Sequence, residues 1–445
     1  LNYQMVQYLP NILFALVFLI LSGNFIRNLK KLFYKINLGK KIKRNNNKYI
    51  RLKKMFLLAF GQSKMFNKPI SAFLHLIVYI GFVIINIELV EIIIDGFFGT
   101  HRVFAPFMGS FYNFLIASFE ILALLVLVSV FLFWTRRNLY KIKRFISNDL
   151  KGWPKTDANL ILYFEVILMT LFLFMNAADY SIQQNFPNDD YYTNAGLFPV
   201  SKYLSYYFIN LPYNTLVTLE RIFWWMHIVG ILLFANYLYY SKHLHILLAF
   251  PNTFYSNLNN LGKFEVLDEI KNEIKMIINP NEVINYDQNQ PPEKFGASDV
   301  TDLTRIQLLN AYTCTECGRC TSECPANQTG KMLSPRKIMM DTRDRLDEVG
   351  RNIYKNGEFI DDGKQLLNDY IKPEELWACT SCNACVEVCP IDIDPLSIII
   401  NMRQYLIMEK SSAPNELNNM MSNIENNGAP WPFNQQDRLS WLNET

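Results

Sequence analysis

The sequence predicts a mainly α protein in two parts, a membrane domain of five transmembrane helices and a helical soluble domain. Two observations lead to this division. Apolar runs long enough to cross a bilayer are confined to the first 250 of the 445 residues. All 8 cysteines lie in the remainder, in two runs of the same spacing. The formal net charge is only +3, which gives no indication of a nucleic-acid partner.

Five apolar segments of about 20 residues are predicted to span the membrane. They cover residues 9–26, 69–94, 111–134, 159–176 and 216–240. The loops after the first and third spans are strongly basic, whereas the other two loops hold little more than Arg102 and Lys202. Basic loops stay on the cytoplasmic side. We therefore expect the N-terminus outside and the cysteine-bearing half in the cytoplasm.

The cysteines form two copies of one pattern, C-x2-C-x2-C-x3-C followed by proline. The copies are Cys314, Cys317, Cys320 and Cys324, and then Cys379, Cys382, Cys385 and Cys389. In bacterial two-cluster ferredoxins, which share this spacing, the fourth cysteine of each run ligates the cluster of the other run. We therefore expect one [4Fe–4S] cluster on Cys314, Cys317, Cys320 and Cys389. The second is expected on Cys379, Cys382, Cys385 and Cys324.

Structural zinc and disulfides are the alternatives to iron–sulfur clusters. Zinc sites are usually built from pairs of ligands, which two identical four-cysteine runs match poorly. Disulfides are rare in the cytoplasm, where the charge pattern places these cysteines. The spacing therefore favours iron–sulfur clusters.

The soluble half divides into three segments by composition. Residues 251–297 hold an amphipathic helix, predicted over 264–278, and a linker over 279–297 that is rich in Asn, Gln and Pro. Residues 298–410 hold both cysteine runs. The long gap between the runs has helical patterns over 335–346, 364–371 and 373–377. We therefore predict an all-helical two-cluster domain rather than a small β-rich ferredoxin, followed by a tail over 411–445 that we expect to dock a partner.

All 5 histidines lie in or beside the predicted membrane half. Histidine is costly in lipid and commonly marks a cofactor or an ion path, although a single one is as readily an interfacial residue. His75 lies at the cytoplasmic start of the second span, and His243 and His245 lie at the cytoplasmic end of the fifth. Matching depth is what two axial ligands of one b-type haem require. We expect His75 to be one of that pair, with His243 and His245 competing for the other place.

A second haem would need ligands nearer the outer side. His227 lies 18 residues before His245, a rise of about 27 Å on a straight helix. The remaining histidine is His101, just past the outer end of the second span. The pair His227 and His101 is therefore a hypothesis for a second b haem, so the sequence predicts one or two haems.

The chain resembles a known group of redox proteins. The stretch 295–343, which contains the first cysteine run, resembles the iron–sulfur segment of heterodisulfide-reductase-type oxidoreductases. The five-span half is similar to the cytochrome b subunit of respiratory nitrate reductase, and fused chains of this kind include electron-transfer-flavoprotein:menaquinone oxidoreductases. The resemblance implies a five-helix transmembrane cytochrome-b-type bundle followed by an α-helical two-cluster [4Fe–4S] ferredoxin domain. It also implies two b haems, with His227 and His245 as fifth-span ligands, whereas that cytochrome has two second-span histidines and this chain has only His75.

The tail also carries a resemblance. Residues 419–445 resemble the segment that leads into a cysteine-rich CCG domain in fused relatives, and no further cysteine follows here. The resemblance therefore implies a separate CCG-domain (heterodisulfide-reductase-like) subunit as partner, or an electron-transfer flavoprotein.

Together these features predict an electron-transfer subunit of a menaquinone-linked oxidoreductase in the bacterial cytoplasmic (inner) membrane. Electrons would pass between the cytoplasmic partner, two [4Fe–4S] clusters, the b haem or haems and the quinone pool. Menaquinol oxidation is the opposite direction of the same path. Two other classes stay open: an anchoring subunit whose clusters are structural, and a redox sensor without quinone turnover.

Overall fold

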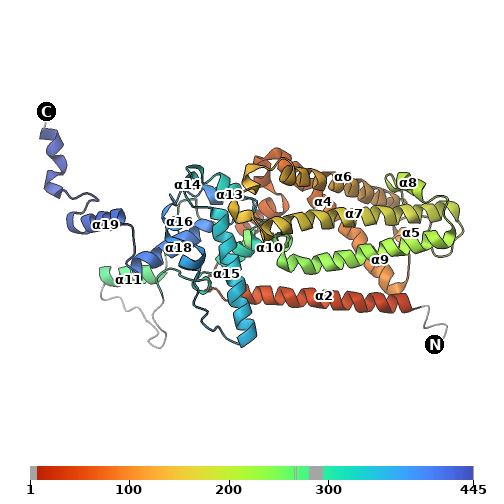
Figure 1. The fold of residues 1–445 in the computed structure, drawn as a ribbon, viewed down its shortest axis with the longest axis horizontal. Coiled ribbons are helices and arrows are strands. Elements are labelled where there is room, and N and C mark those ends of the chain that lie inside the picture. Colours follow the sequence, from red (N-terminus) through yellow and green to blue (C-terminus); the bar gives the residue numbers. More distant parts are fainter. Residues whose placement is uncertain (1–7, 265, 267, 280–293, 444–445) are drawn as a thin grey trace.

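The computed structural model describes residues 8–264, 266, 268–279 and 294–443. Within these ranges the chain forms helices and helical turns, and the only ladder-type pairings are two isolated bridges. Five long helices run side by side, and the cysteine-bearing domain sits at one end of them (Figure 1). The mainly α fold with five membrane-length helices agrees with the sequence prediction.

The spanning helices are α2 (Leu9–Ile36), α4 (Pro69–Phe98), α6 (Ser110–Asn138), α7 (Trp153–Asn185) and α9 (Tyr213–Tyr237). Each contains an apolar stretch long enough to cross a bilayer. Four of them run on beyond the predicted ends, because a helix continues past the hydrocarbon wherever its polar turns find protein or water. The fifth span continues through the turn Leu238–Tyr240 and ends where the sequence predicts.

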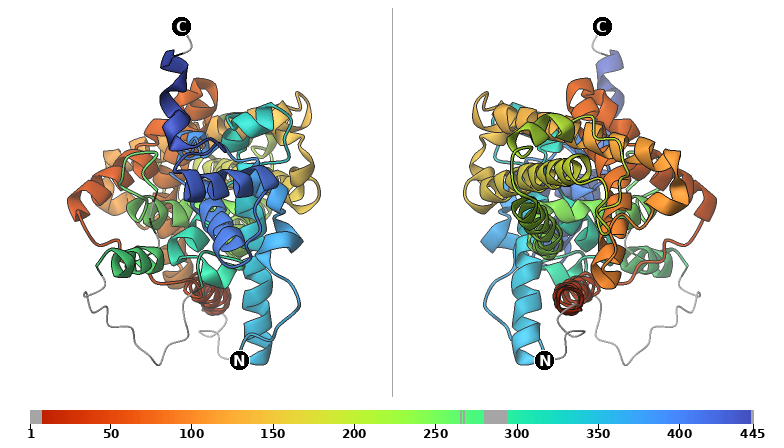
Figure 2. Two further views of the ribbon diagram at one scale, coloured as in Figure 1. Left: turned by 90° about the vertical axis from the view of Figure 1, so that its left-hand side faces the viewer. Right: turned by 90° about the vertical axis from the view of Figure 1, so that its right-hand side faces the viewer.

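The bundle is built around α7, which packs against both α6 and α9, while α4 packs against α6. Helix α2 contacts α9 and α4 but leaves most of its apolar residues exposed. Viewed end-on, α2 lies at the rim of the bundle (Figure 2). The aromatic side chains of Phe14, Phe119, Phe172 and Trp224 pack in one buried cluster of the bundle.

The soluble domain is held by three helices, α12 (Arg305–Thr313), α15 (Pro335–Asn356) and α18 (Pro395–Met408). Helix α12 begins with a capping box in which Thr304 and Gln307 satisfy each other's backbone donors. Ser334 caps α15, which begins at Pro335, where the helical pattern predicts its start, and runs ten residues further than expected. Four short helices connect these elements: α13 (Arg319–Ser322), α14 (Pro325–Gln328), α16 (Pro373–Trp377) and α17 (Ala384–Glu387).

Two helix predictions need correction. The segment 364–371 is not a regular helix: only Leu366–Tyr370 is helical, and Leu367 and Asn368 inside it have non-helical dihedral angles, with φ of 77° at Asn368. Burial of both leucines decides this conformation. The amphipathic helix α11 (Asp268–Ile278) begins four residues later than predicted. Most of the linker over 279–297 lies outside the described residues.

The membrane and soluble parts share one hydrophobic core. The last turns of α2 place Leu32 and Ile36 in a cluster with Leu308, Leu346 and other buried residues of the soluble domain. Helix α10 (His245–Phe254) crosses the predicted boundary at residue 250 and packs against α12. The basic loop after the first span contributes α3 (Lys48–Met55) and an isolated bridge between Lys40 and Thr304. At Gly39 a Cβ would lie 2.7 Å from the carbonyl oxygen of Leu303, so this close approach requires glycine.

A buried ion pair ties the second basic loop to the soluble domain. The guanidinium of Arg336 on α15 is 1% exposed and donates from Nε and Nη2 to the carboxylate of Asp149 at 3.0 and 2.8 Å. It also donates to the carbonyl oxygen of Arg144 at 2.9 Å. Asp149 lies in the turn Asn148–Leu150 that precedes α7.

We expect Arg336→Met to lower the free energy of unfolding by about 3–5 kcal/mol, because it leaves the carboxylate of Asp149 without its charged partner in a buried contact. Denaturation in detergent measures this change. Lys355→Met, an exposed change of the same charge on α15, should alter stability by less than about 0.5 kcal/mol. The double variant with Asp149→Asn should cost less than the sum of the single changes. An additive result would contradict the ion-pair argument.

This ion pair also predicts a dependence on pH. Burial raises the pKa of Asp149, but hydrogen bonds from Ser147 and Arg336 and the charge of Arg336 outweigh it and hold the pKa below the ordinary 3.8. The unfolded chain therefore binds this proton first as the pH falls. The contribution is complete above the ordinary pKa and is lost as the pH falls through the lowered one. Asp149→Asn should lack this contribution. Its free energy of unfolding should therefore fall less between pH 5 and about pH 2 than that of the parent protein.

Candidate redox site at the membrane end of the cysteine domain

The two cysteine runs have the same local backbone geometry. Glu316 and Gly318 in the first run have φ of 56° and 73°, and Ser381 and Asn383, at the equivalent positions of the second, have φ of 55° and 63°. Left-handed residues at these points curl each run, so that its thiols gather on one side and its amides turn inward. Three of the four are not glycine, and the strain they bear is typical of functional sites.

The fourth cysteine of each run lies with the first three of the other. Burial, and after it the neighbouring thiol of Cys317, raise the pKa of Cys389 to about 12, and Cys314 adds to the effect. Burial also raises the pKa of Cys379, with Cys324 and Cys382 among the neighbours that contribute. Helices α13 and α17, which follow the two runs, pack against each other. Cys389 is therefore a neighbour of first-run cysteines and Cys324 of second-run cysteines, an arrangement compatible with crossed ligation, which stays a prediction.

Burial raises the pKa of several of these thiols, among them Cys314, Cys385 and Cys389. Without a metal ion, burial disfavours the thiolate, whereas coordination deprotonates the thiol outright. Backbone amides already point at two of the sulfur atoms: Ser381 N lies 3.4 Å from Cys379 Sγ, and Ile393 N lies 3.3 Å from Cys389 Sγ. Such hydrogen bonds are among the features that set cluster potentials.

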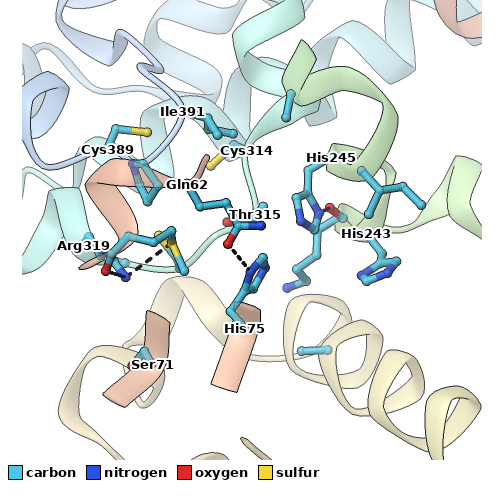
Figure 3. Close-up of a pocket in the computed structure, with 18 of the residues that line it drawn as sticks. Gln62, Ser71, His75, His243, His245, Cys314, Thr315, Arg319, Cys389 and Ile391 are labelled. Atoms are coloured by element: carbon cyan, nitrogen blue, oxygen red, sulfur yellow. Dashed lines mark hydrogen bonds between the residues drawn. The ribbon is translucent and has the colours of Figure 1, made fainter. Parts of the chain in front are cut away.

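A cavity of about 490 Å³ joins the first thiol group to the membrane bundle. Cys314, Cys317, Cys320 and Cys389 lie on its wall, and so do His75, His243 and His245. Figure 3 shows His75 rising from α4 toward the two other histidines, with Cys314 and Cys389 on the far side. Cysteines and histidines that are far apart in the sequence therefore face one cavity.

His75 and His245 are spaced as two ligands of one metal ion. Their ring centroids are 6.4 Å apart. Two imidazoles on a single metal need a separation of about 6 Å, given metal–nitrogen bonds of about 2 Å. Nδ1 of His75 bonds to Gln62 Oε1 at 3.0 Å, and Nδ1 of His245 bonds to the carbonyl oxygen of Lys242 at 3.2 Å. These bonds hold the proton on Nδ1 and leave both Nε2 atoms as free ligands.

His243 lies beside this pair. Its ring contacts the rings of Phe234 and His245, with centroids 5.6 and 5.4 Å away. Burial, followed by the charges of His245 and His75, lowers the pKa of His243 to about 3, and burial lowers that of His245 as well. Both rings are therefore neutral at pH 7, the form in which imidazole binds metals. The 6.4 Å separation of the His245 and His75 rings favours His245 as the partner of His75.

The cavity also holds basic groups that lack hydrogen-bond partners. Nη1 of Arg136, Nε of Arg137 and Nε of Arg144 are buried and unpartnered among the described residues, and all three side chains line the cavity. Buried donors without partners are rare and costly. Haem carries two propionate groups, which would satisfy such donors. The free Nε2 atoms could ligate a haem iron in this cavity, and the unpartnered arginine nitrogens could bind its propionates.

His101 and His227 lie outside this cavity. His101 uses both ring nitrogens: Nδ1 accepts from the amide of Thr193 at 3.1 Å, and Nε2 lies 3.3 Å from Asp179 Oδ2. His227 is buried against Phe172 and has an unpartnered Nδ1. A second haem on these residues stays a prediction, for which this geometry offers less support than for the first.

The second thiol group lies nearer the surface. Cys324, Cys379 and Cys382 do not line the cavity, whereas the buried Cys385 does, and Cys382 is exposed. Arg403 fixes the loop beside it by donating to the carbonyl oxygen of Leu376 at 2.6 Å and by stacking on Trp377 at 5.0 Å. All four cysteines of the first group therefore line the histidine cavity, whereas the second group reaches it through Cys385 and the surface through Cys382.

Sequence reasoning missed several of these residues. Gln62 adopts a left-handed conformation, with φ of 49°, just before a short turn, and no sequence signal marks it as the partner of His75. Arg136, Arg137 and Arg144 follow the third span, where basic residues are fully explained by membrane orientation. Their turn into the cavity depends on packing against the soluble domain.

Comparisons with known proteins agree with the cysteine geometry. The family described as 4Fe-4S dicluster domain matches residues 313–393. The chain is 28% identical to the "Probable iron-sulfur-binding oxidoreductase FadF" of Bacillus subtilis, over 97% of this chain and 61% of that protein. It is 26% identical to "EtfAB:quinone oxidoreductase" of Syntrophomonas wolfei, over 91% of this chain and 55% of that protein. A third relative, 31% identical over 33% of this chain and 24% of its own length, is a "Probable membrane-anchored ferredoxin" of Chromohalobacter salexigens.

Shorter matches include subunits C and D of heterodisulfide reductases. No solved structure matches the chain. The chain thus spans little more than half the length of the first two curated relatives. Its relatives are named as iron–sulfur oxidoreductases, their subunits and a membrane-anchored ferredoxin, and the chain itself combines a match to a 4Fe-4S dicluster domain with five membrane-length helices.

Proposed function

We propose that this protein is the membrane-bound electron-transfer subunit of a quinone-linked oxidoreductase. The observation that carries the proposal is the single cavity that has cysteines of the first thiol group on one wall and His75, His243 and His245 on the other. A cofactor held by the cysteines and a cofactor held by the histidines would be neighbours there. Such an arrangement has a use in electron transfer and none in anchoring.

In this proposal each thiol group holds one [4Fe–4S] cluster. Cys314, Cys317, Cys320 and Cys389 hold the cluster beside the cavity, and Cys379, Cys382, Cys385 and Cys324 hold the cluster near the surface. The exposure of Cys382 supports the second as the entry point for electrons from a cytoplasmic partner. The clusters supply one-electron carriers, and the residues around them keep water out and direct amides at the sulfur atoms.

His75 and His245 are proposed as the axial ligands of a b haem in the cavity, with Arg136, Arg137 and Arg144 facing its propionates. Gln62 and the Lys242 carbonyl orient the two rings. Membrane menaquinone is the proposed partner of this haem, a suggestion that draws on the name of the quinone oxidoreductase relative. The proposed cytoplasmic partner is a CCG-type protein or an electron-transfer flavoprotein. The soluble half would lie on the cytoplasmic side of the inner membrane, as its flanking basic loops suggest.

The test is cofactor analysis combined with redox spectroscopy on the purified protein. We expect about eight non-haem irons, from two four-iron clusters, and one b haem per chain. A menaquinone analogue should re-oxidise the dithionite-reduced haem. Eight non-haem irons with no haem absorption would overturn the proposed electron path through a haem and favour an anchoring subunit. Full cofactors without any quinone reaction would favour a redox sensor.

Gln62 offers a finer test of His75 as a ligand. In Gln62→Leu the ring loses the acceptor for its Nδ1 proton, so haem affinity should fall by about 10–100-fold and the haem midpoint potential should rise. Gln62→Glu keeps an acceptor, now charged, and should lower the potential. Spectroelectrochemical titration measures both. Equal potentials in the two variants and the parent would show that His75 does not ligate the haem.

A further inference from the structure

A second cavity lies at the junction of the membrane bundle and the soluble domain. Its volume is about 870 Å³, and its walls include the last turns of α2, the first turns of α7, the end of the fifth span and helix α15. Arg27, which lines it, directly follows the apolar run of α2. The cavity therefore sits at the depth where the hydrocarbon ends and the headgroups of one leaflet begin.

The lining carries an excess of positive charge. It contains seven Lys and Arg residues and four Asp and Glu residues. Internal ion pairs account for all four carboxylates: Lys35 pairs with Asp347 at 2.5 Å, Lys242 pairs with Glu316 and lies 3.9 Å from Asp157, and Arg343 pairs with Asp344 at 3.1 Å. The lining cations that remain are Arg27, Lys30, Lys31 and Arg351.

These four cations have no carboxylate partner among the described residues. Arg27 donates to the side chain of Asn24 at 2.6 Å, Lys31 lies 4.5 Å above the ring of Tyr354, and Arg351 donates to the carbonyl oxygen of Asp347 at 3.2 Å. Arg27, Lys30 and Lys31 share one face of α2, because positions three and four residues apart are neighbours on a helix. They face α15, which carries Arg351.

The rim of the cavity is aromatic. Tyr34, Trp153, Tyr240 and Tyr354 line it and are 51–73% exposed. Tyrosine and tryptophan with exposed rings are enriched at headgroup depth. Below the basic turns, α2 presents Leu16, Leu19 and Ile20 to the surroundings, each more than half exposed. A ligand here would meet cations at its head and an apolar helix surface along its length.

We infer that this cavity binds an anionic phospholipid, with its phosphate against Arg27, Lys30, Lys31 and Arg351 and its acyl chains along α2. Basic pockets between transmembrane helices are recognised binding sites for anionic headgroups. The lipid would bridge α2, which lies at the rim of the bundle, to α15 of the cysteine domain. The inference is independent of the proposed redox function, because none of the four cations lines the cavity of the histidines.

Native mass spectrometry of the full protein in detergent tests this inference, with phosphatidylglycerol and phosphatidylcholine as probes. The parent protein should retain phosphatidylglycerol in preference to phosphatidylcholine. R27Q/K30Q/K31Q should bind phosphatidylglycerol about 100-fold more weakly, from the loss of three basic residues at the surface. R351Q, which changes the opposite wall, should show a smaller loss. The matched control K141Q/K143Q/K151Q removes three exposed basic residues from the other basic loop and should bind like the parent.

Thermal unfolding provides the second readout. Added phosphatidylglycerol should raise the melting temperature of the parent and of the control, but not that of R27Q/K30Q/K31Q, whose lipid-free melting temperature should equal that of the parent. Equal retention of phosphatidylglycerol by the parent and R27Q/K30Q/K31Q would overturn the inference. So would equal binding of the two lipids, or displacement of the lipid by millimolar inorganic phosphate, which would indicate a simple anion site.

Discussion

Replacing either His75 or His245 by alanine is expected to abolish the b haem. Removing even an outer-shell partner of a metal ligand costs about 10–100-fold in affinity, so loss of the ligand itself should reduce haem content by about tenfold or more. The 6.4 Å separation of the two rings and their paired Nδ1 hydrogen bonds lead to this expectation. Pyridine haemochrome spectra of the purified variants measure it, and the non-haem iron content should stay unchanged.

Two other histidine variants serve as controls. His243→Ala removes a ring beside the pair and should leave haem content close to that of the parent. His101→Ala removes a ring whose two nitrogens already contact Asp179 and Thr193. This variant should also retain the cavity haem. If His243→Ala loses the haem and His245→Ala keeps it, the assignment of the two residues is reversed. If His101→Ala and His227→Ala each lose one of two haems, the second site of the sequence prediction exists.

Replacing the fourth cysteine of either run by serine should remove one cluster. The cluster that is lost should be the one held by the first three cysteines of the other run. Cys389→Ser should eliminate the cluster beside the cavity, because the thiol of Cys389 lies with those of Cys314 and Cys317. Cys324→Ser should eliminate the cluster near the surface. In each variant the non-haem iron should fall from about eight to about four per chain, and electron paramagnetic resonance should retain one of the two reduced-cluster signals.

The two variants should also differ in function. Cys389→Ser breaks the link to the cavity, so a cytoplasmic reductant should no longer reduce the haem through the surface cluster. Cys324→Ser should remove the entry point and leave the cluster at the cavity intact. Comparison of each variant with a cysteine-to-serine change in the first run and one in the second run distinguishes crossed ligation from ligation within one run. If Cys389→Ser behaves like Cys379→Ser rather than like Cys317→Ser, the crossed assignment is wrong.

The local features of this protein could be predicted from the sequence because they depend on short-range physics. A run of apolar residues has to form a helix in lipid, where its backbone can bond only to itself, and the five spans followed from that. The spacing of each cysteine run determines which thiols one curled loop can bring together. The capped start of α15 at Ser334 and Pro335 is equally local.

The tertiary structure decided how these parts meet. Nothing in the sequence shows that Leu32 and Ile36 of the first span enter the core of the cysteine domain, or that Arg336 reaches back to Asp149. Gln62 and the orphaned donors of Arg136, Arg137 and Arg144 reach the histidine cavity only because the basic loops fold against that domain. These contacts join residues far apart in the sequence, such as Arg336 and Asp149, which are 187 positions apart, and their free energy comes from burial and ion pairing, which sequence spacing does not encode. The sequence therefore determined the candidate ligands, and packing alone decided which of them face one another.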